Sequence, residues 1–92
     1  MRIKADYVIK NIGEDVIVVP IKDEAIRFNG IISLNKTGEF LFKALQNQSL
    51  SEEALVNLLV GHYEVDKALA KKDCIAFIEK CKNHGLIDEE SL

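Results

Sequence analysis

Residues 28–42 read FNGIISLNKTGEFLF, and they place a turn, a short strand, a helix cap and an amphipathic helix in direct succession. Asn29-Gly30 favours a turn with positive φ angles, and Ile31 to Leu34 has the composition of a strand. Asn35 is a strong N-cap candidate, because its side chain can accept from the backbone N–H groups two or three residues later. The chain is therefore predicted to leave a sheet at Asn35 and to enter a helix without a spacer.

The residues before this stretch predict a β-hairpin. Residues 6–12 mix apolar and polar positions, Gly13-Glu14-Asp15 turns the chain, and Val16 to Val19 is a β-branched run that Pro20 ends. With the strand at 31–34, the hairpin forms a three-stranded antiparallel sheet. One outer strand of such a sheet has an unpaired edge.

The residues after Asn35 predict three helices, each with apolar residues at helical spacing on one face. The three core stripes are Gly38, Leu41, Phe42 and Leu45; Leu55, Leu58 and Leu59; and Ala70, Cys74, Phe77, Ile78 and Cys81. Ser49-Leu50-Ser51-Glu52 fits a capping box for the second helix. Asp66 can cap the third helix, and Gly85 can end it in the left-handed conformation. Strands followed by helices indicate an α+β fold.

Length and composition predict a single domain over residues 1–92. With 48% hydrophobic and 29% charged residues, the composition is typical of a soluble globular protein. No run approaches the roughly 20 apolar residues of a membrane span, and the N-terminus lacks the apolar segment of a signal peptide. We therefore expect a cytoplasmic protein with no membrane partner.

A metal site is the first candidate function, because Cys74, Cys81, His62 and His84 are usual ligand types. Cys81 and His84 are close neighbours on a helix, but Cys74 is two turns away from them. Two ligands do not make a structural zinc site. We therefore predict that both thiols are buried apolar groups and that no metal or other cofactor is bound.

Catalysis and DNA binding are the next candidates. The sequence has no glycine-rich phosphate loop, nucleophile elbow or His-Glu-x-x-His motif, so we predict no enzymatic activity. A winged-helix DNA-binding regulator is the alternative, because the third helix carries several lysines. Against it stand a net charge of −3 and a chain with two arginines, Arg2 and Arg27. We therefore expect no nucleic acid partner.

Peptide capture is the remaining candidate. An extended peptide can add to an open sheet edge, and a nearby helix can supply pockets for its side chains. The core stripe of the third helix leaves Lys71, Ile75, Glu79 and Lys82 as a second stripe. In a competing interpretation, Ile75 packs against a neighbouring loop and the lysines are solvated. On the residues alone, that competing interpretation is the stronger one.

Three groups of residues resemble the PqqD-like family along nearly the whole chain. They are Gly30 with Leu34-Asn35-Lys36-Thr37-Gly38 and Leu41-Phe42; Ser51-Glu52-Glu53-Ala54-Leu55-Val56 with Tyr63; and Asp73-Cys74, Phe77-Ile78, Cys81 and Gly85-Leu86-Ile87. Members of this family are small winged-helix-like modules, also called RiPP recognition elements. The sequence departs from the family at Phe42, where many relatives have Trp, and at Cys74 and Cys81, where larger aliphatic residues are usual.

The resemblance implies a non-catalytic module that binds the leader of a ribosomally made precursor peptide by strand addition. The module would present that leader to a modifying enzyme, often a radical S-adenosylmethionine enzyme. The implied docking strand is Ile31, Ile32, Ser33 and Leu34, and the implied opposite wall is Lys71, Ile75 and Lys82. The lysines would pair with acidic leader residues and Ile75 with an apolar one. The same open edge makes a homodimer possible.

Overall fold

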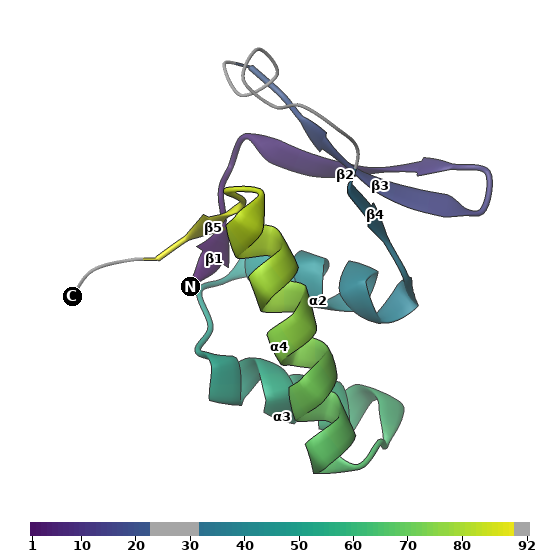
Figure 1. Ribbon diagram of the computed structural model, residues 1–92, viewed down its shortest axis with the longest axis vertical. Helices are drawn as coiled ribbons and strands as arrows, with labels where there is room; N and C mark the ends of the chain where they lie inside the picture. Colours follow the sequence, from purple (N-terminus) through teal and green to yellow (C-terminus); the bar gives the residue numbers. More distant parts are fainter. Residues whose placement is uncertain (23–31, 90–92) are drawn as a thin grey trace.

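The computed structural model describes residues 1–22 and 32–89, and its elements follow the predicted order (Figure 1). The strands are β1 (Arg2–Ile3), β2 (Tyr7–Ile12), β3 (Asp15–Pro20), β4 (Ile32–Leu34) and β5 (Ile87–Asp88). The helices are α2 (Lys36–Asn47), α3 (Glu52–Tyr63) and α4 (Lys67–Asn83). The predicted α+β fold, a three-stranded antiparallel sheet followed by three helices, is confirmed.

The larger sheet has the order β2-β3-β4, with both pairs antiparallel. The hairpin turns on two residues, Gly13 and Glu14, because β3 already begins at Asp15. Gly13 has φ +62, a conformation that favours glycine. The Asn29-Gly30 turn and Ile31 lie outside the described residues. From Ile32 onward, the predicted strand is present as β4.

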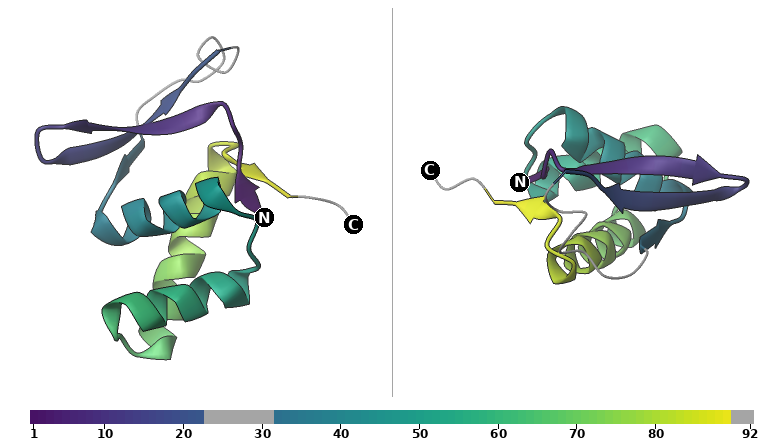
Figure 2. Two further views of the ribbon diagram at one scale, coloured as in Figure 1. Left: turned by 180° about the vertical axis from the view of Figure 1, so that it is seen from behind. Right: turned by 90° about the horizontal axis from the view of Figure 1, so that it is seen from above.

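β4 presents alternate residues to the interior and to solvent, as a strand of a half-covered sheet does. Ile32 and Leu34 are buried, whereas Ser33 between them is exposed. Ser33 lies opposite Ile17 of β3. Figure 2 shows that the sheet lies across one end of the helical layer. The two apolar side chains of β4 therefore join the common core.

The first helix begins as predicted, but the cap of the second differs. The Asn35 side chain accepts a hydrogen bond from the Gly38 N–H at 2.7 Å. α3 is capped by Ser51, whose hydroxyl accepts from the Ala54 N–H at 3.1 Å. The predicted capping box starting at Ser49 is therefore wrong. The Ser49 hydroxyl lies two residues before the cap and accepts from the N-terminal ammonium at 3.4 Å.

The three helices bury one continuous core together with the sheet. The predicted stripes of α2 and α4 are buried at every position. In α3 the prediction fails at Leu58, which is 38% exposed, and Val56 is buried in its place. α3 packs against α4 through Leu55, Val56 and Leu59, and this choice of face turns Leu58 outward. None of the described helices is long and apolar enough to cross a membrane.

A second, two-stranded sheet joins the two ends of the described chain, and the sequence analysis did not predict it. β1 and β5 pair antiparallel, with Ile3 opposite Ile87. Gly85, at φ +72, ends α4 and reverses the chain as predicted. Leu86 then enters the core with no exposed surface. Figure 1 shows this pair beside the C-terminal end of α4.

Candidate functional site

A groove of about 210 Å³ lies between β4 and α4, next to the first turn of α2. From the sheet side and α2 it is lined by Ser33, Leu34, Asn35, Thr37, Gly38 and Leu41. From α4 it is lined by Asp73, Ala76, Phe77 and Lys80. The groove therefore combines a strand edge, a helix start and one face of a second helix.

The strand wall is the outer edge of β4. Among the described strands, β4 pairs with β3 on one side and has no strand on the other. The Ser33 carbonyl accepts a hydrogen bond from the Lys80 ammonium of α4 at 2.8 Å. This carbonyl therefore faces the groove. Because the N–H and C=O of one residue point to the same side of an antiparallel strand, the Ser33 N–H shares that side.

The helix wall is a stripe of α4 at the spacing i, i+3, i+4, i+7. Residues at this spacing share one helix face. Phe77 is 6% exposed and forms part of the floor, while Ala76 is small and exposed. Asp73 and Lys80 stand at the two ends, about 10.5 Å apart along the axis for seven residues of α-helix. The wall thus has a small apolar centre between two opposite charges.

Gly38 lets the start of α2 close tightly against β4. A Cβ atom at this position would lie 3.3 Å from the Asn35 Oδ1 and 3.3 Å from the Leu34 Cδ2. Those contacts are tighter than ordinary van der Waals distances. A side chain at residue 38 would press on the same Asn35 oxygen that accepts from the Gly38 N–H. Glycine at residue 38 therefore allows β4, the Asn35 cap and the start of α2 to pack closely beside the groove.

The predicted site residues are distributed over two places. Ser33 and Leu34 line the groove, and the buried side chains of Ile32 and Leu34 anchor the strand in the core. Lys71, Ile75 and Lys82 do not line the groove. At about 3.6 residues per turn they lie roughly half a turn around α4 from it. Their part in leader binding stays a prediction, and Ile31 lies outside the described residues.

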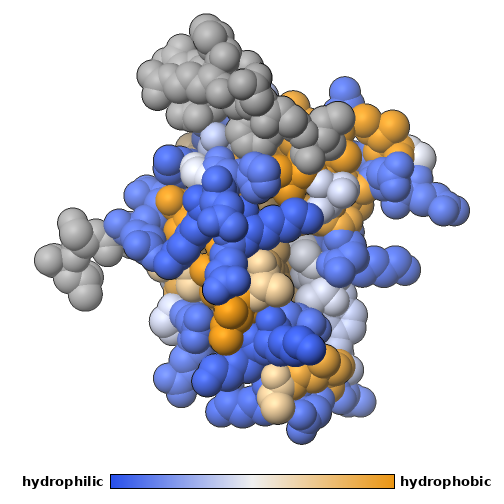
Figure 3. Space-filling view, viewed as in Figure 1, coloured by the Kyte–Doolittle hydropathy of each residue, from blue (hydrophilic) through white to orange (hydrophobic). Residues whose placement is uncertain are grey.

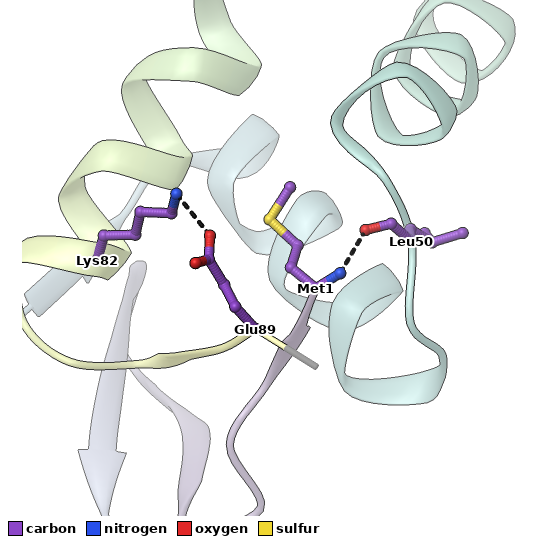
Figure 4. Close-up of polar contacts among 4 residues, drawn as sticks. All are labelled: Met1, Leu50, Lys82 and Glu89. Carbon is purple, nitrogen blue, oxygen red and sulfur yellow. Dashed lines mark hydrogen bonds and ion pairs between the residues drawn. The ribbon is translucent and has the colours of Figure 1, made fainter. Parts of the chain in front are cut away.

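Lys82 has a different neighbour. Its ammonium forms an ion pair with the Glu89 carboxylate at 2.6 Å (Figure 4). The hydrogen bond to Glu89 raises the pKa of Lys82, and the same bond lowers the pKa of Glu89. Figure 4 also shows the Met1 ammonium donating to the Leu50 carbonyl at 2.9 Å. The first contact joins Glu89 to α4, and the second joins Met1 to the connection between α2 and α3; none of these four residues lines the groove.

Both thiols are fully buried in α4. Burial, with a smaller effect from the Asp73 carboxylate, raises the pKa of Cys74 to about 11. Burial also raises the pKa of Cys81 to about 12. They pack as the predicted apolar groups. Among residues 1–22 and 32–89, no three His, Cys, Asp or Glu side chains gather as a metal site would require.

Lys80 is one of several groove residues, with Asp73, Ala76 and Phe77 of α4, that sequence reasoning did not identify as site residues. In the sequence, Lys80 was considered only as one of several lysines on the third helix. The available signal was the stripe Asp73, Ala76, Phe77 and Lys80, which flanks the core stripe on the other side from Ile75. In Figure 3 the face around α4 is mostly hydrophilic, with small apolar areas between charged side chains. Polarity alone therefore does not distinguish the two flanks.

Comparison with known proteins agrees with this fold. One solved structure, described as TbiB1 in complex with the TbiA(beta) leader peptide, superposes with a TM-score of 0.71 at 18% identity and covers 100% of both chains. A second, described as lasso peptide synthetase B1 complexed with the leader peptide, has a TM-score of 0.67 at 18% identity. It covers 92% of this chain and 93% of the other. At this identity the likeness concerns the fold.

A search of curated protein sequences finds no match. The family described as Coenzyme PQQ synthesis protein D (PqqD) matches residues 11–87, a range that includes the end of β2, all of β3 and β4, and all three described helices. That match gives no support to the DNA-binding alternative. By this match over most of its length, the chain is a member of the PqqD family.

Proposed function

We propose that this protein is a non-catalytic module that binds the leader segment of a ribosomally made precursor peptide. The leader adds as a strand to the outer edge of β4 and lies in the groove against α4. The observation that carries the proposal is the groove-facing backbone of Ser33, exposed between two buried neighbours. Membership of the PqqD family and the leader-bound structural neighbours support it.

The chemistry of the groove fits an extended peptide better than a small substrate. The strand wall offers backbone hydrogen bonds, which any extended peptide can use. The helix wall offers a small apolar centre with a charge at each end, which can select side chains. Ile31, Ile32, Ser33 and Leu34 remain the proposed docking strand. Lys71, Ile75 and Lys82 are proposed as a secondary contact for leader residues that extend around α4.

The bound leader is delivered to a modifying enzyme in the cytoplasm, where the precursor is made. We propose a radical S-adenosylmethionine enzyme as that partner. One structural neighbour is described as a lasso peptide synthetase B1, which makes an enzyme of lasso peptide synthesis the competing partner. A homodimer through the β4 edge would occupy the same hydrogen-bonding groups. We therefore propose that leader binding and edge-to-edge pairing exclude each other.

Affinity capture tests this function. The tagged chain is co-expressed with candidate precursor peptides and enzymes from the same source, and the captured peptide is titrated into labelled protein. The expected amide shifts are largest at residues 32–34 and along the groove side of α4. Shifts centred on the β2–β3 hairpin, around residues 7–19, would place the leader elsewhere. Size-exclusion chromatography with and without peptide shows whether binding removes a dimer.

A further inference from the structure

Lys80 occupies an acceptor that an added strand needs. Its ammonium donates to the Ser33 carbonyl at 2.8 Å, and that carbonyl faces the groove. A strand adding to an edge donates its own backbone N–H groups to such carbonyls. The docking edge is therefore capped by a side chain of the same protein. An incoming peptide has to compete with that side chain.

The groove offers the displaced ammonium little in exchange. Among the described residues that line it, the carboxylate is that of Asp73. Asp73 is seven residues from Lys80, so their Cα atoms lie about 10.5 Å apart along α4, and the Lys80 ammonium donates to the Ser33 carbonyl rather than to the Asp73 carboxylate. Lys80 is exposed, so water hydrates its ammonium when the Ser33 carbonyl is lost as an acceptor. The new acceptor has to come from the peptide or from water.

We propose that Lys80 makes the groove selective for a peptide with an acidic side chain at one fixed position. A peptide N–H donates to the Ser33 carbonyl in place of Lys80. The peptide carboxylate then accepts a hydrogen bond from the released Lys80 ammonium. A carboxylate is a stronger acceptor for an ammonium than a neutral carbonyl is. The exchange therefore favours acidic peptides over neutral ones. This inference rests on the proposed function, because it assumes strand addition at β4.

The position of the acidic residue follows from strand geometry. Successive side chains of an extended peptide point to opposite faces, so only alternate residues point toward α4. The four-carbon stem of Lys80 is flexible, which lets its ammonium move from the edge to a nearby carboxylate. The selected residue is therefore one whose side chain points toward α4 beside Ser33. Its neighbours in the peptide are free to vary.

Display of short random peptides against three full-length proteins tests the inference. The proteins are wild type, Lys80→Met, and Lys72→Met as a control with the same charge change at an exposed α4 lysine outside the groove. We expect Asp or Glu at one position in the wild-type and Lys72→Met pools, and no such position in the Lys80→Met pool. Circular dichroism checks that each variant is folded.

Calorimetry on the best wild-type peptide gives the quantitative result. Replacing its acidic residue by the amide should weaken binding to wild type by about tenfold and to Lys80→Met by less than about twofold. Lys80→Arg, which keeps the charge, should retain the acidic preference. The role of Lys80 is overturned if Lys80→Met keeps the acidic preference or if wild type shows none. Either result leaves strand addition at β4 intact. Folded proteins that enrich no peptide contradict strand addition itself, and the inference with it.

Discussion

At the scale of single residues, burial raises the pKa of the Cys74 thiol, and this makes the stability of the fold depend on pH. Below pH 9.0, the ordinary thiol pKa, Cys74 is protonated in both the folded and the unfolded chain. Above that pH the unfolded chain loses the proton, while the folded chain keeps it until about pH 11. The unfolded state then binds fewer protons, so the stability that the buried thiol contributes falls as the pH rises.

Comparison with Cys74→Ala isolates this effect. At about pH 8 the variant should be less stable by about 1–3 kcal/mol, the usual cost of a small core cavity. At about pH 10 that difference should shrink by about 1 kcal/mol, because the wild type alone has lost the contribution of the thiol. Urea unfolding at both pH values measures the difference, and lysine titration cancels between the two proteins. A difference that stays constant with pH would contradict the raised pKa.

The cap of α2 is the second feature that one residue controls. Asn35→Ala removes the acceptor of the Gly38 N–H and should lower the free energy of unfolding by about 1 kcal/mol. Asn35→Asp keeps an acceptor and should retain most of the stability. Ser51→Ala, at the cap of α3, is the matched control and should cost a similar amount. If only the α3 variant loses stability, the Asn35 cap does not stabilise the fold.

Residues whose roles depend on near neighbours in sequence were predictable, and those that depend on distant ones were not. Asn35 and Gly85 act through backbone groups a few positions away, so their roles follow from the sequence. The contact between Lys80 and Ser33 joins residues 47 positions apart. Two serines stand before α3, and the pattern alone does not distinguish which one caps it. In the structure the cap is Ser51, and Ser49 contacts the N-terminal ammonium, 48 positions away in the sequence.

At the scale of elements, β4 is proposed to bind through its backbone. Ser33→Pro removes the groove-facing N–H while leaving the strand at an edge, where proline is tolerated. It should weaken leader binding at least roughly tenfold. Ser33→Ala keeps the N–H and should bind almost like wild type. Calorimetry with the captured leader compares them, and equal affinities for the two folded variants would contradict strand addition.

The two flanks of α4 are distinguished by a second pair of variants. Ala76→Trp fills the groove between α4 and β4 and should weaken leader binding by about tenfold or more. Ile75→Ala removes the apolar residue of the opposite flank and should change affinity by less than about threefold. Thermal unfolding confirms that both variants fold. The reverse ranking would move the binding wall to Lys71, Ile75 and Lys82.

Periodicity predicted the core face of α4 but not the flank that faces the sheet. The stripe Ala70, Cys74, Phe77, Ile78 and Cys81 is buried at every position. Residues on either side of that stripe are equally polar, so the sequence pattern treats both flanks alike. The direction in which α4 crosses the sheet decides between them. The pairing of β1 with β5 escaped prediction for a different reason, because two-residue strands are too short to show a period.

At the scale of the whole molecule, charge separates a peptide-binding module from a DNA-binding regulator. The chain has 12 basic and 15 acidic residues, for a net charge of −3. On α4, Lys82 is engaged by Glu89 and Lys80 by the Ser33 carbonyl, which leaves three of its five lysines, Lys67, Lys71 and Lys72, to neutralise phosphates. Binding to duplex DNA should therefore be weak and should vanish as salt rises from roughly 50 to 200 mM.

Fluorescence anisotropy with labelled duplexes measures this prediction, and the captured leader peptide serves as the comparison under the same conditions. Backbone hydrogen bonds and apolar contacts depend little on ionic strength, whereas counterion release does. Leader binding should therefore survive at a salt concentration that removes DNA binding. Lys72→Met, which changes an exposed α4 lysine outside the groove, should weaken DNA binding further and leave leader affinity unchanged. Tight, sequence-selective DNA binding at physiological salt would instead identify the α4 surface as a nucleic-acid interface and overturn the peptide-binding assignment.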